Sequence, residues 1–415
     1  MKIILLIFAI TIAISNRIEA QRPSTSLDDL LQNVFNPKPT PNPNNGNVIP
    51  TKAPVPTNPN TPQTGDGASY APCGDNKICV PFYNCKNDTG NLNTDGEYLL
   101  DIRFDDTKSC ASYLETCCSL IDKSTDVPVV TPKPQEYKKG CGNRNADGVL
   151  FRITGNKEGE TEYGEFPWMV AILKQEQAGE EILNIYQCGG SIIHPQVVLT
   201  AAHCVYKNSA HELLARAGEW DTQTKDELYR EQDRQVIEIV LHEQFSKGGL
   251  HNDIALLFTA QPYDLGIDVN TVCLPPPNTN FENVRCFATG WGKDQFGQQG
   301  KYQVILKKID VPVVAHDQCQ ASLRDTRLGK FFQLHESFIC AGGEPGKDVC
   351  KGDGGGPLSC PISGQKNKYY QAGIVAWGIG CGGTNPGVYA SVSHLRPWID
   401  NVMSSRGFDS SHYTA

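Results

Sequence analysis

Residues 348–360 read DVCKGDGGGPLSC, and two shorter stretches precede them, LTAAHCV at 199–205 and HNDIALL at 251–257. Around them, short apolar runs separated by Gly, Pro and Asn recur to the end of the chain, at residues 168–173, 191–193, 197–202, 236–241, 254–258, 305–314, 371–377 and 387–392. Runs of this length and punctuation predict a large antiparallel all-β domain. Only the end of the chain has helical spacing, with Ser393 as the expected cap before a stripe of Leu395, Trp398, Ile399, Val402 and Met403.

The composition limits the function of this chain. Its 415 residues are enough for about two or three domains and at least one sizeable core. The 46 Asp and Glu residues outnumber the 37 Lys and Arg residues, giving a net charge of -9 without any basic tract, so a surface for nucleic-acid phosphates is not expected. The 16 cysteines, an even number, predict an oxidising compartment where thiols pair with one another.

The first 20 residues have the form of a signal peptide. Lys2 precedes an apolar run from Ile3 to Ile14, and the small residue Ala20 stands where a signal peptidase would cut. The run is too short to cross a membrane, and no second apolar run of about 20 residues follows. We expect a secreted protein with a signal peptide (1–20), a Pro/Asn-rich segment (21–68), a cysteine-rich module (69–120), a linker (121–152) and the large β domain (153–415).

The cysteine-rich module has six cysteines within residues 73–118. A segment of this size cannot bury enough surface for independent stability, so disulfides worth about 2–4 kcal/mol each must stabilise it. Spacing alone excludes only a bridge between the adjacent Cys117 and Cys118. The long loop before Cys110 carries an N-glycosylation acceptor sequence at Asn87, so a glycoprotein is expected.

Taken alone, the histidine of LTAAHCV would more often be structural than catalytic. The order of the three stretches changes that interpretation. His203, then Asp253, then a turn of the G-D-x-G-G-P type resembles the trypsin-like serine proteases, whose triad runs His, Asp, Ser. The resemblance covers residues 140–407 and includes GEFPWMVAI, CGGSII, ATGWG, VAWG and PGVYASV. It implies a trypsin-like double β-barrel with a C-terminal helix.

The resemblance also implies disulfide pairs. In the β domain these are Cys141–Cys273, Cys188–Cys204, Cys286–Cys360, Cys319–Cys340 and Cys350–Cys381. The cysteine-rich module resembles the clip domain of arthropods, because its pattern ends in adjacent cysteines, and this implies Cys73–Cys117, Cys79–Cys110 and Cys85–Cys118. The bridge from Cys141 would keep the linker joined to the protease-like body after a cut in the linker.

The nucleophile position departs from the family pattern, because Gly354 stands where serine belongs. His203 then has no hydroxyl to deprotonate, and no acyl-enzyme can form. We therefore expect no enzymatic activity, with His203, Asp253 and Gly354 as remnants. Ala376 agrees, since it replaces a serine that helps to hold the triad aspartate in the family. A need for glycine's backbone freedom does not explain Gly354, because active relatives make this turn with serine.

Other parts of the family's site persist. Asp348 lies where relatives place the carboxylate at the bottom of the specificity pocket, and Gly378 and Gly387 match the glycines that keep the pocket open. The slot either holds an Arg or Lys side chain without cutting it or is an unused inheritance, which is the interpretation we favour. The same holds for an oxyanion hole made by the amides of Gly352 and Gly354.

The loop after Gly218 is acidic and corresponds to the loop that binds Ca²⁺ in some relatives. Ca²⁺ takes about six to eight oxygen ligands, and carboxylates suit it. A solvated charged loop is the favoured interpretation, and we expect no required cofactor. The alternative is a calcium site formed by Glu219, Asp221, Asp226 and Glu231.

Three arginines are candidates for activation by limited proteolysis. Arg152 precedes Ile153 at the family's activation site, where a new amino terminus would pair with Asp353, but a domain without a nucleophile has nothing to activate there. Arg144 is a second candidate in the linker. Arg103, in the long loop of the clip-like module, is the preferred processing site, with Arg152 as the alternative.

A clip-like module before an inactive trypsin-like domain resembles the clip-domain serine protease homologues of insect haemolymph, which include masquerade-like proteins. The nearest resemblance is to the non-catalytic members that act in prophenoloxidase activation. This implies a secreted haemolymph protein of innate immunity, a zymogen-like binding cofactor in melanisation that an upstream protease activates. Its partners would be phenoloxidase and a catalytic clip-domain protease, with homo-oligomers left open and neither nucleic acid nor membrane involved.

Two further hypotheses come from other classes of protein. The main alternative is a microbial-surface recognition or cell-adhesion protein built on a pseudoprotease. An enzyme with a rescued nucleophile is a third hypothesis, and Gly354 argues against it.

Overall fold

The computed structural model describes short stretches of the clip-like module and most of the chain that follows. The described residues are 71–74, 77–81, 85–86, 91–92, 99–101, 110, 115–119, 137–149, 152–154, 159–178, 181–222, 229–292, 302–345, 353–380 and 383–415. Several features expected from the sequence lie outside them, namely the signal peptide, the Pro/Asn-rich segment, Asn87, Arg103, Asp226, Asp348 and Gly352.

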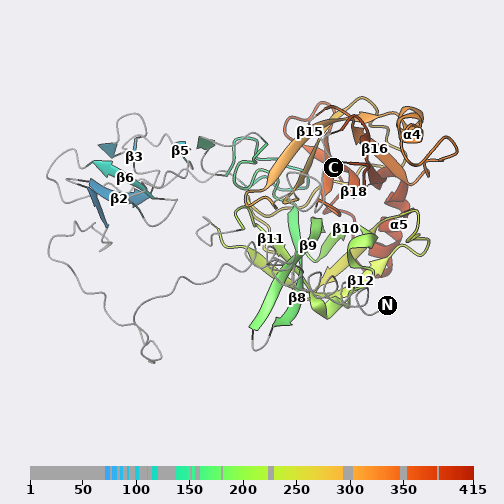
Figure 1. Ribbon diagram of the computed structural model, residues 1–415. Coiled ribbons are helices and arrows are strands. Elements are labelled where there is room, and N and C mark those ends of the chain that lie inside the picture. Colours follow the sequence, from blue (N-terminus) through green and yellow to red (C-terminus); the bar gives the residue numbers. More distant parts are fainter. Residues whose placement is uncertain are drawn as a thin grey trace, which may run out of the picture.

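Five short strands form one sheet in the clip-like module (Figure 1). In spatial order they are β1 (Pro72–Gly74), β2 (Lys77–Pro81), β6 (Glu115–Ser119), β4 (Asn91–Leu92) and β3 (Cys85–Lys86). The disulfides Cys73–Cys117 and Cys79–Cys110 cross-link this region, as the resemblance implied. Its small described core, with Val80 fully buried, explains why the module needs covalent bridges.

Two closed six-stranded barrels make up the large domain, which confirms the expected double β-barrel (Figure 1). The first contains β8 (Met169–Ala178), β9 (Glu181–His194), β10 (Val197–Thr200), β11 (Leu213–Ala217), β12 (Gln232–Leu241) and β13 (Ala255–Thr259). The second contains β14 (Arg285–Gly290), β15 (Lys307–Val314), β16 (Phe338–Gly342), β17 (Pro357–Pro361), β18 (Tyr369–Trp377) and β19 (Pro386–Ser391). Closure leaves neither barrel with an unpaired edge strand.

The register of two buried strands places the segments that carry chemistry. β10 and β13 are buried at every position and pair antiparallel, with Thr200 opposite Ala255. The residues directly after β10 and directly before β13 therefore emerge at the same end of the first barrel. His203 and Asp253 belong to these two segments, so their proximity follows from strand pairing.

Helices are more numerous than the sequence pattern indicated. The expected C-terminal helix is α5 (Val392–Ser405). Three further helical elements precede it, namely α3 (Ala202–Val205), the 3₁₀ turn η2 (Ala210–Glu212) and α4 (His316–Arg324). The prediction that only the end of the chain is helical was wrong. The sequence pattern did not reveal α4 because this helix buries only Cys319 and Leu323 and so has no long apolar stripe. The predicted cap of α5 was also wrong: Ser391 is the cap, its hydroxyl accepting a hydrogen bond from His394 N at 3.4 Å.

A two-stranded parallel sheet connects the clip-like module to the start of the large domain. β5 (Leu99–Asp101) pairs with β7 (Arg152–Thr154), with Leu99 opposite Arg152 and Leu100 opposite Ile153. No pattern in the sequence indicated this pairing, which joins segments more than fifty residues apart. Within the described residues, no helix is long and apolar enough to span a membrane.

Candidate functional site

The first barrel supplies a complete His–Asp pair. The Nδ1 atom of His203 lies 2.6 Å from Asp253 Oδ2, and the backbone N–H of His203 donates to Asp253 Oδ1 at 2.7 Å. Asp253 is fully buried, whereas about a quarter of the His203 side chain is exposed. One carboxylate thus fixes both the backbone and the ring of His203, which orients Nε2 toward the neighbouring barrel.

The second barrel supplies a turn that keeps its backbone bonds. Gly355 N donates to Val375 O at 2.9 Å, and Gly354 O accepts from Gly189 N of the first barrel, also at 2.9 Å. Gly355 has φ of 78°, in the region that favours glycine, whereas Gly354 does not have a positive φ. The glycine at residue 354 is therefore not required by backbone conformation, as the sequence comparison had argued.

The missing side chain at residue 354 faces the histidine. A β-carbon added to Gly354 would lie 2.9 Å from His203 Nε2 and 3.6 Å from Cys188 Sγ. This places residue 354 where a triad serine would stand, with no hydroxyl for His203 to deprotonate. A separation of 2.9 Å is also shorter than a real β-carbon contact, so a side chain here would displace the imidazole from its present position.

Asp353 lies in a small cradle beside this turn. Its Oδ1 accepts a hydrogen bond from Gly292 N at 2.8 Å, and a β-carbon at Gly290 or Gly292 would overlap the carboxylate. Burial, and then the charge of Asp353, raise the pKa of Tyr186 and Tyr302. A cut after Arg152, the alternative processing site, would free an amino terminus at Ile153 to pair with Asp353, but in the uncut chain the Ile153 backbone pairs with β5.

The specificity pocket is described only in part, because Asp348 and Gly352 lie outside the described residues. Among the described residues, a β-carbon on Gly378 would meet Gly380 O, at 3.8 Å, an ordinary van der Waals contact. Gly387 pairs with Ala341 between β19 and β16. Ala376 is buried in an apolar cluster, so this position offers no hydroxyl.

Arg216 of β11 places a positive charge beside the acidic residues that follow Gly218. Arg216 donates to both oxygens of Asp233, from Nε at 2.7 Å and Nη2 at 2.9 Å, and its Nη1 lies 3.2 Å from Glu219 Oε2. Burial would lower the pKa of Arg216, but hydrogen bonds and charges from Asp233 and Glu219 raise it above its ordinary value. Glu219 Oε2 is thus paired with a side chain of this protein, and Glu219 and Asp221 are both buried among the described residues. Asp226, the fourth expected ligand residue besides Asp221 and Glu231, lies outside them.

The sequence interpretation overlooked Arg216. It is the one charged residue of the strand LLARA, all of whose residues are buried. A cation in a strand of this kind requires a buried counter-charge, and this was the signal that could have identified the pair with Asp233.

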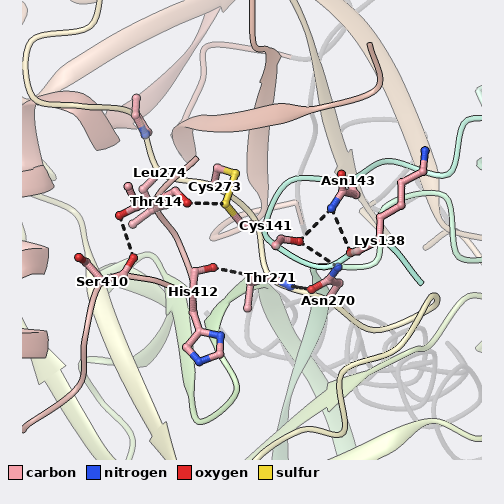
Figure 2. The surroundings of a disulfide bond; sticks show 12 residues. Lys138, Cys141, Asn143, Asn270, Thr271, Cys273, Leu274, Ser410, His412 and Thr414 are labelled. Carbon is pink, nitrogen blue, oxygen red and sulfur yellow. Dashed lines mark hydrogen bonds between the residues drawn. A yellow bond between two sulfur atoms is a disulfide. The ribbon is translucent and has the colours of Figure 1, made fainter. Parts of the chain in front are cut away.

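The Cys141–Cys273 disulfide joins the linker to the body, as expected. Both cysteines are buried, and the C-terminal tail covers them (Figure 2). Thr271 Oγ1 donates to His412 O at 2.6 Å, Leu274 N donates to Tyr413 O at 2.8 Å, and Cys141 Sγ lies 3.5 Å from Thr414 O. A cut between Cys141 and Cys273 would therefore leave both fragments held by a shielded covalent bond.

Arg144, a candidate processing site, is sequestered beside this bridge. Its Nε donates to Glu165 Oε1 at 2.9 Å, and its guanidinium carbon lies 4.3 Å from the centroid of the Phe287 ring. Glu165 is buried and also accepts from Lys308 Nζ. A protease could reach Arg144 only by breaking this buried ion cluster.

The remaining disulfides agree with the expected pairing as far as they are described. Cys188–Cys204, Cys286–Cys360 and Cys319–Cys340 are all formed. Cys118 is disulfide-bonded. The two other expected pairs, Cys85–Cys118 and Cys350–Cys381, involve cysteine side chains outside the described residues.

Comparison with known protein families places both parts of the chain. The trypsin family model matches residues 155–399, and a model described as the serine protease clip domain of PPAF-2 matches residues 66–119. The chain belongs to the clip-domain serine protease homologues. This clip-domain homologue is 56% identical to phenoloxidase-activating factor 2 of Galleria mellonella over 296 residues, which cover 69% of this chain and 97% of that protein.

Two other relatives differ in what their names say about catalysis. The inactive CLIP domain-containing serine protease A8 of Anopheles gambiae is 38% identical over 79% of this chain and 88% of its own length. Phenoloxidase-activating factor 1 of Holotrichia diomphalia is 31% identical over 79% of this chain and 91% of its own length.

Proposed function

We propose that this clip-domain homologue is a secreted, catalytically inactive binding cofactor of the phenoloxidase-activating cascade, itself activated by limited proteolysis. One observation carries the proposal: Gly354 occupies the nucleophile position opposite an otherwise complete His203–Asp253 pair. Because the pair is retained while the attacking oxygen is lost, the domain keeps the shape of a protease without its chemistry.

The magnitude of the loss rules out a role in peptide cleavage. Removing the serine of a comparable enzyme lowers turnover by about 2 × 10⁶. An ordinary turnover of about 10 s⁻¹ would then fall to a few events per week. Any function in a cascade must therefore come from binding.

The names of the relatives support the place in the cascade. Two of them are phenoloxidase-activating factors, and one is an inactive clip-domain protease. The partners that we propose are phenoloxidase and a catalytic clip-domain protease, with an upstream protease that processes this chain. The described cysteines are all paired, which supports an extracellular location such as haemolymph.

We place the activating cut at Arg103. The backbone of Arg152 pairs with Leu99 in the parallel sheet of β5 and β7, and a protease must bind its substrate in a free extended form. Arg103 follows β5 by two residues in the sequence and lies outside the described residues. The bridges Cys73–Cys117 and Cys79–Cys110 both span it, so a cut would open the module and release neither half.

Reconstitution tests the proposed function. Purified prophenoloxidase and its active protease are combined with and without the processed protein, and phenoloxidase activity is measured. We expect the protein to increase the activity, and Arg103→Gln to abolish the increase while Arg152→Gln leaves it intact. Amino-terminal sequencing should find a new end at Phe104. An end at Ile153, or full support by Arg103→Gln, would refute the processing site; no increase in activity, together with binding to microbial surfaces, would favour the recognition hypothesis.

A further inference from the structure

Two histidines from different barrels stack face to face. The rings of His251 and His335 have centroids 4.2 Å apart and an interplanar angle of 11°. His251 lies in the loop 242–254, between β12 and β13 of the first barrel. His335 lies in the loop 325–337, between α4 and β16 of the second barrel. The stack therefore joins two loops that the chain builds from separate segments.

Close contacts hold the two half-buried rings in place. Phe338, at the start of β16, meets both rings edge-on, with its centroid 6.0 Å from that of His251 and 6.5 Å from that of His335. A β-carbon at Gly249 would lie 2.6 Å from His251 Nε2, so the His251 ring also packs closely on its own loop. Neither ring can turn far without losing these contacts.

Hydrogen bonds select the neutral form of His335. Ser337 N donates to His335 Nδ1 at 3.2 Å, and the Ser337 hydroxyl lies 2.9 Å from the same nitrogen. Because a backbone N–H can only donate, Nδ1 is an acceptor here, and the ring carries its single proton on Nε2. A second proton, on Nδ1, would remove both of these hydrogen bonds.

The same serine connects the stack to the segment before Asp253. Ser337 is buried, and its hydroxyl oxygen accepts a hydrogen bond from Asn252 N at 3.0 Å. Leu250 and Asn252 have φ of 54° and 51°, a conformation that residues other than glycine keep only when surrounding contacts impose it. Opening the stack would therefore release a strained segment directly before the His203–Asp253 pair.

The charges around the stack do not favour an imidazolium in it. Burial, and then the charge of His335, lower the pKa of His251 from its ordinary value of 6.5. Asp253, two residues after His251, is engaged by His203. The other charged residues of the two loops are all exposed, and in the described part of the chain none of them forms an ion pair with either ring: Glu243, Lys247, Asp325, Arg327, Lys330 and Glu336.

We propose that the His251–His335 stack is a proton-operated latch between the two barrels. At neutral pH both imidazoles are uncharged and the latch is closed. In weak acid they take up protons from the solvent, and two like charges on rings with centroids 4.2 Å apart repel each other. Residues 250–252 then move away from the loop 325–337. The latch acts within a single chain, so it does not rest on the proposed cofactor function.

The direction of the pH effect follows from which state binds protons more readily. In the open state His251 regains its ordinary pKa of 6.5, whereas in the closed stack this pKa is lower. Below about pH 6.5 the open state therefore binds more protons than the closed state. The latch is closed above that pH and opens progressively as the pH falls.

Amide hydrogen exchange of the full-length, uncut protein tests the latch. Mass spectrometry follows peptides that cover residues 246–258 and 333–342 at pH 7.5 and pH 5.5, with each rate corrected for the intrinsic effect of pH on exchange. We expect the corrected exchange in both peptides to increase by about tenfold at the lower pH. Peptides from β10, a strand buried at every position, should change by less than about twofold.

Two variants remove the titrating group but keep its contact. His251→Phe retains a ring for the stack, and His335→Asn retains an acceptor for Ser337 N. Each should reduce the tenfold increase to less than about twofold. His211→Asn, an exposed histidine of η2, is the control and should keep the full increase. Thermal unfolding at pH 7.5 verifies that all three variants are folded.

A measurement on the parent needs no variant. Deuterium exchange at the imidazole C2–H, followed against pH, gives the pKa of His251, which we expect below 6.5. A pKa at or above 6.5 overturns the latch. Equal corrected amide exchange at the two pH values also overturns it, as does an increase that persists in both His251→Phe and His335→Asn. An equal increase in β10 would show unfolding of the whole domain and would overturn it as well.

Discussion

The two barrels contribute unequally to what remains of the catalytic centre. In the first barrel, the Asp253 carboxylate is fully buried and accepts hydrogen bonds from both the backbone and the ring of His203. In the second barrel, the turn around Gly354 keeps its backbone bonds, yet the side chain that did the chemistry is gone. The difference follows from what each residue does for the fold. Asp253 satisfies the His203 backbone amide as well as its ring, whereas a serine at residue 354 would satisfy no backbone group that the turn leaves open.

The largest expected effect is the loss of stability when the His203–Asp253 pair of the first barrel is broken. Asp253→Ala removes the buried carboxylate that accepts from both the amide and the ring of His203, and should destabilise the domain by about 2–4 kcal/mol, lowering Tm by about 5–10 °C. Gly354→Ala is the matched change in the second barrel. Its φ is not positive, but the added β-carbon would lie 2.9 Å from His203 Nε2, so the partly exposed imidazole must shift and we expect a smaller loss of about 1 kcal/mol. Differential scanning calorimetry of the two variants makes the measurement. Equal losses of stability in the two variants would show that residues 253 and 354 contribute equally to the fold.

In the turn of the second barrel, Gly355 should tolerate substitution by alanine far less well than Gly354. Gly355 has φ of 78°, and a β-carbon there would overlap Thr200 Oγ1 and Gly189 O of the first barrel. Gly355→Ala should therefore cost about 2–3 kcal/mol from backbone strain and the overlap. Chemical denaturation of Gly355→Ala beside Gly354→Ala tests this, and similar midpoints would contradict it.

A smaller effect comes from His194, at the end of β9 in the first barrel. Burial, and then the charge of His412, lower the pKa of His194 from 6.5 to about 4, while Asp409 opposes the shift. Since the unfolded chain then binds more protons than the folded one between about pH 6.5 and pH 4, stability should decrease as pH falls through this window. His194→Asn should reduce the loss, measured as the change in Tm between pH 7 and pH 4.5. The exposed His211→Asn is the control, and equal pH dependence in both variants would count against this assignment.

The smallest expected effect is on catalysis. Gly354→Ser should restore little or no hydrolysis of an Arg ester, because the added β-carbon falls 2.9 Å from His203 Nε2 and Ala376 provides no hydroxyl. The parent should match a catalyst-free control before and after processing. Turnover well above that control in the parent would refute the inactive assignment, and strong activity of Gly354→Ser would show that the histidine can move aside.

Much of the fold and of the site could be predicted from the sequence. The order His203, Asp253, Gly354 resembles that of the trypsin-like proteases, and this resemblance implied two barrels and a centre without a nucleophile. The sequence analysis missed several elements because their apolar patterns are short or mixed. Five of them are β11, β14, β16, β17 and α4. Periodicity cannot identify such segments, since their burial comes from neighbours distant in the sequence.

The sequence alone determined which chemistry is absent, since a residue without an oxygen cannot become a nucleophile in any fold. The resemblance to the two families implied the cysteine pairs, and each bridge that the structure describes agrees with it. Tertiary structure alone decided which charges are neutralised and which residues are accessible. Three contacts depend on three-dimensional packing in this way: Arg216 with Asp233, Arg144 with Glu165, and β5 with β7. The electrostatic energy of such pairs depends on burial and separation, and neither can be read from order along the chain.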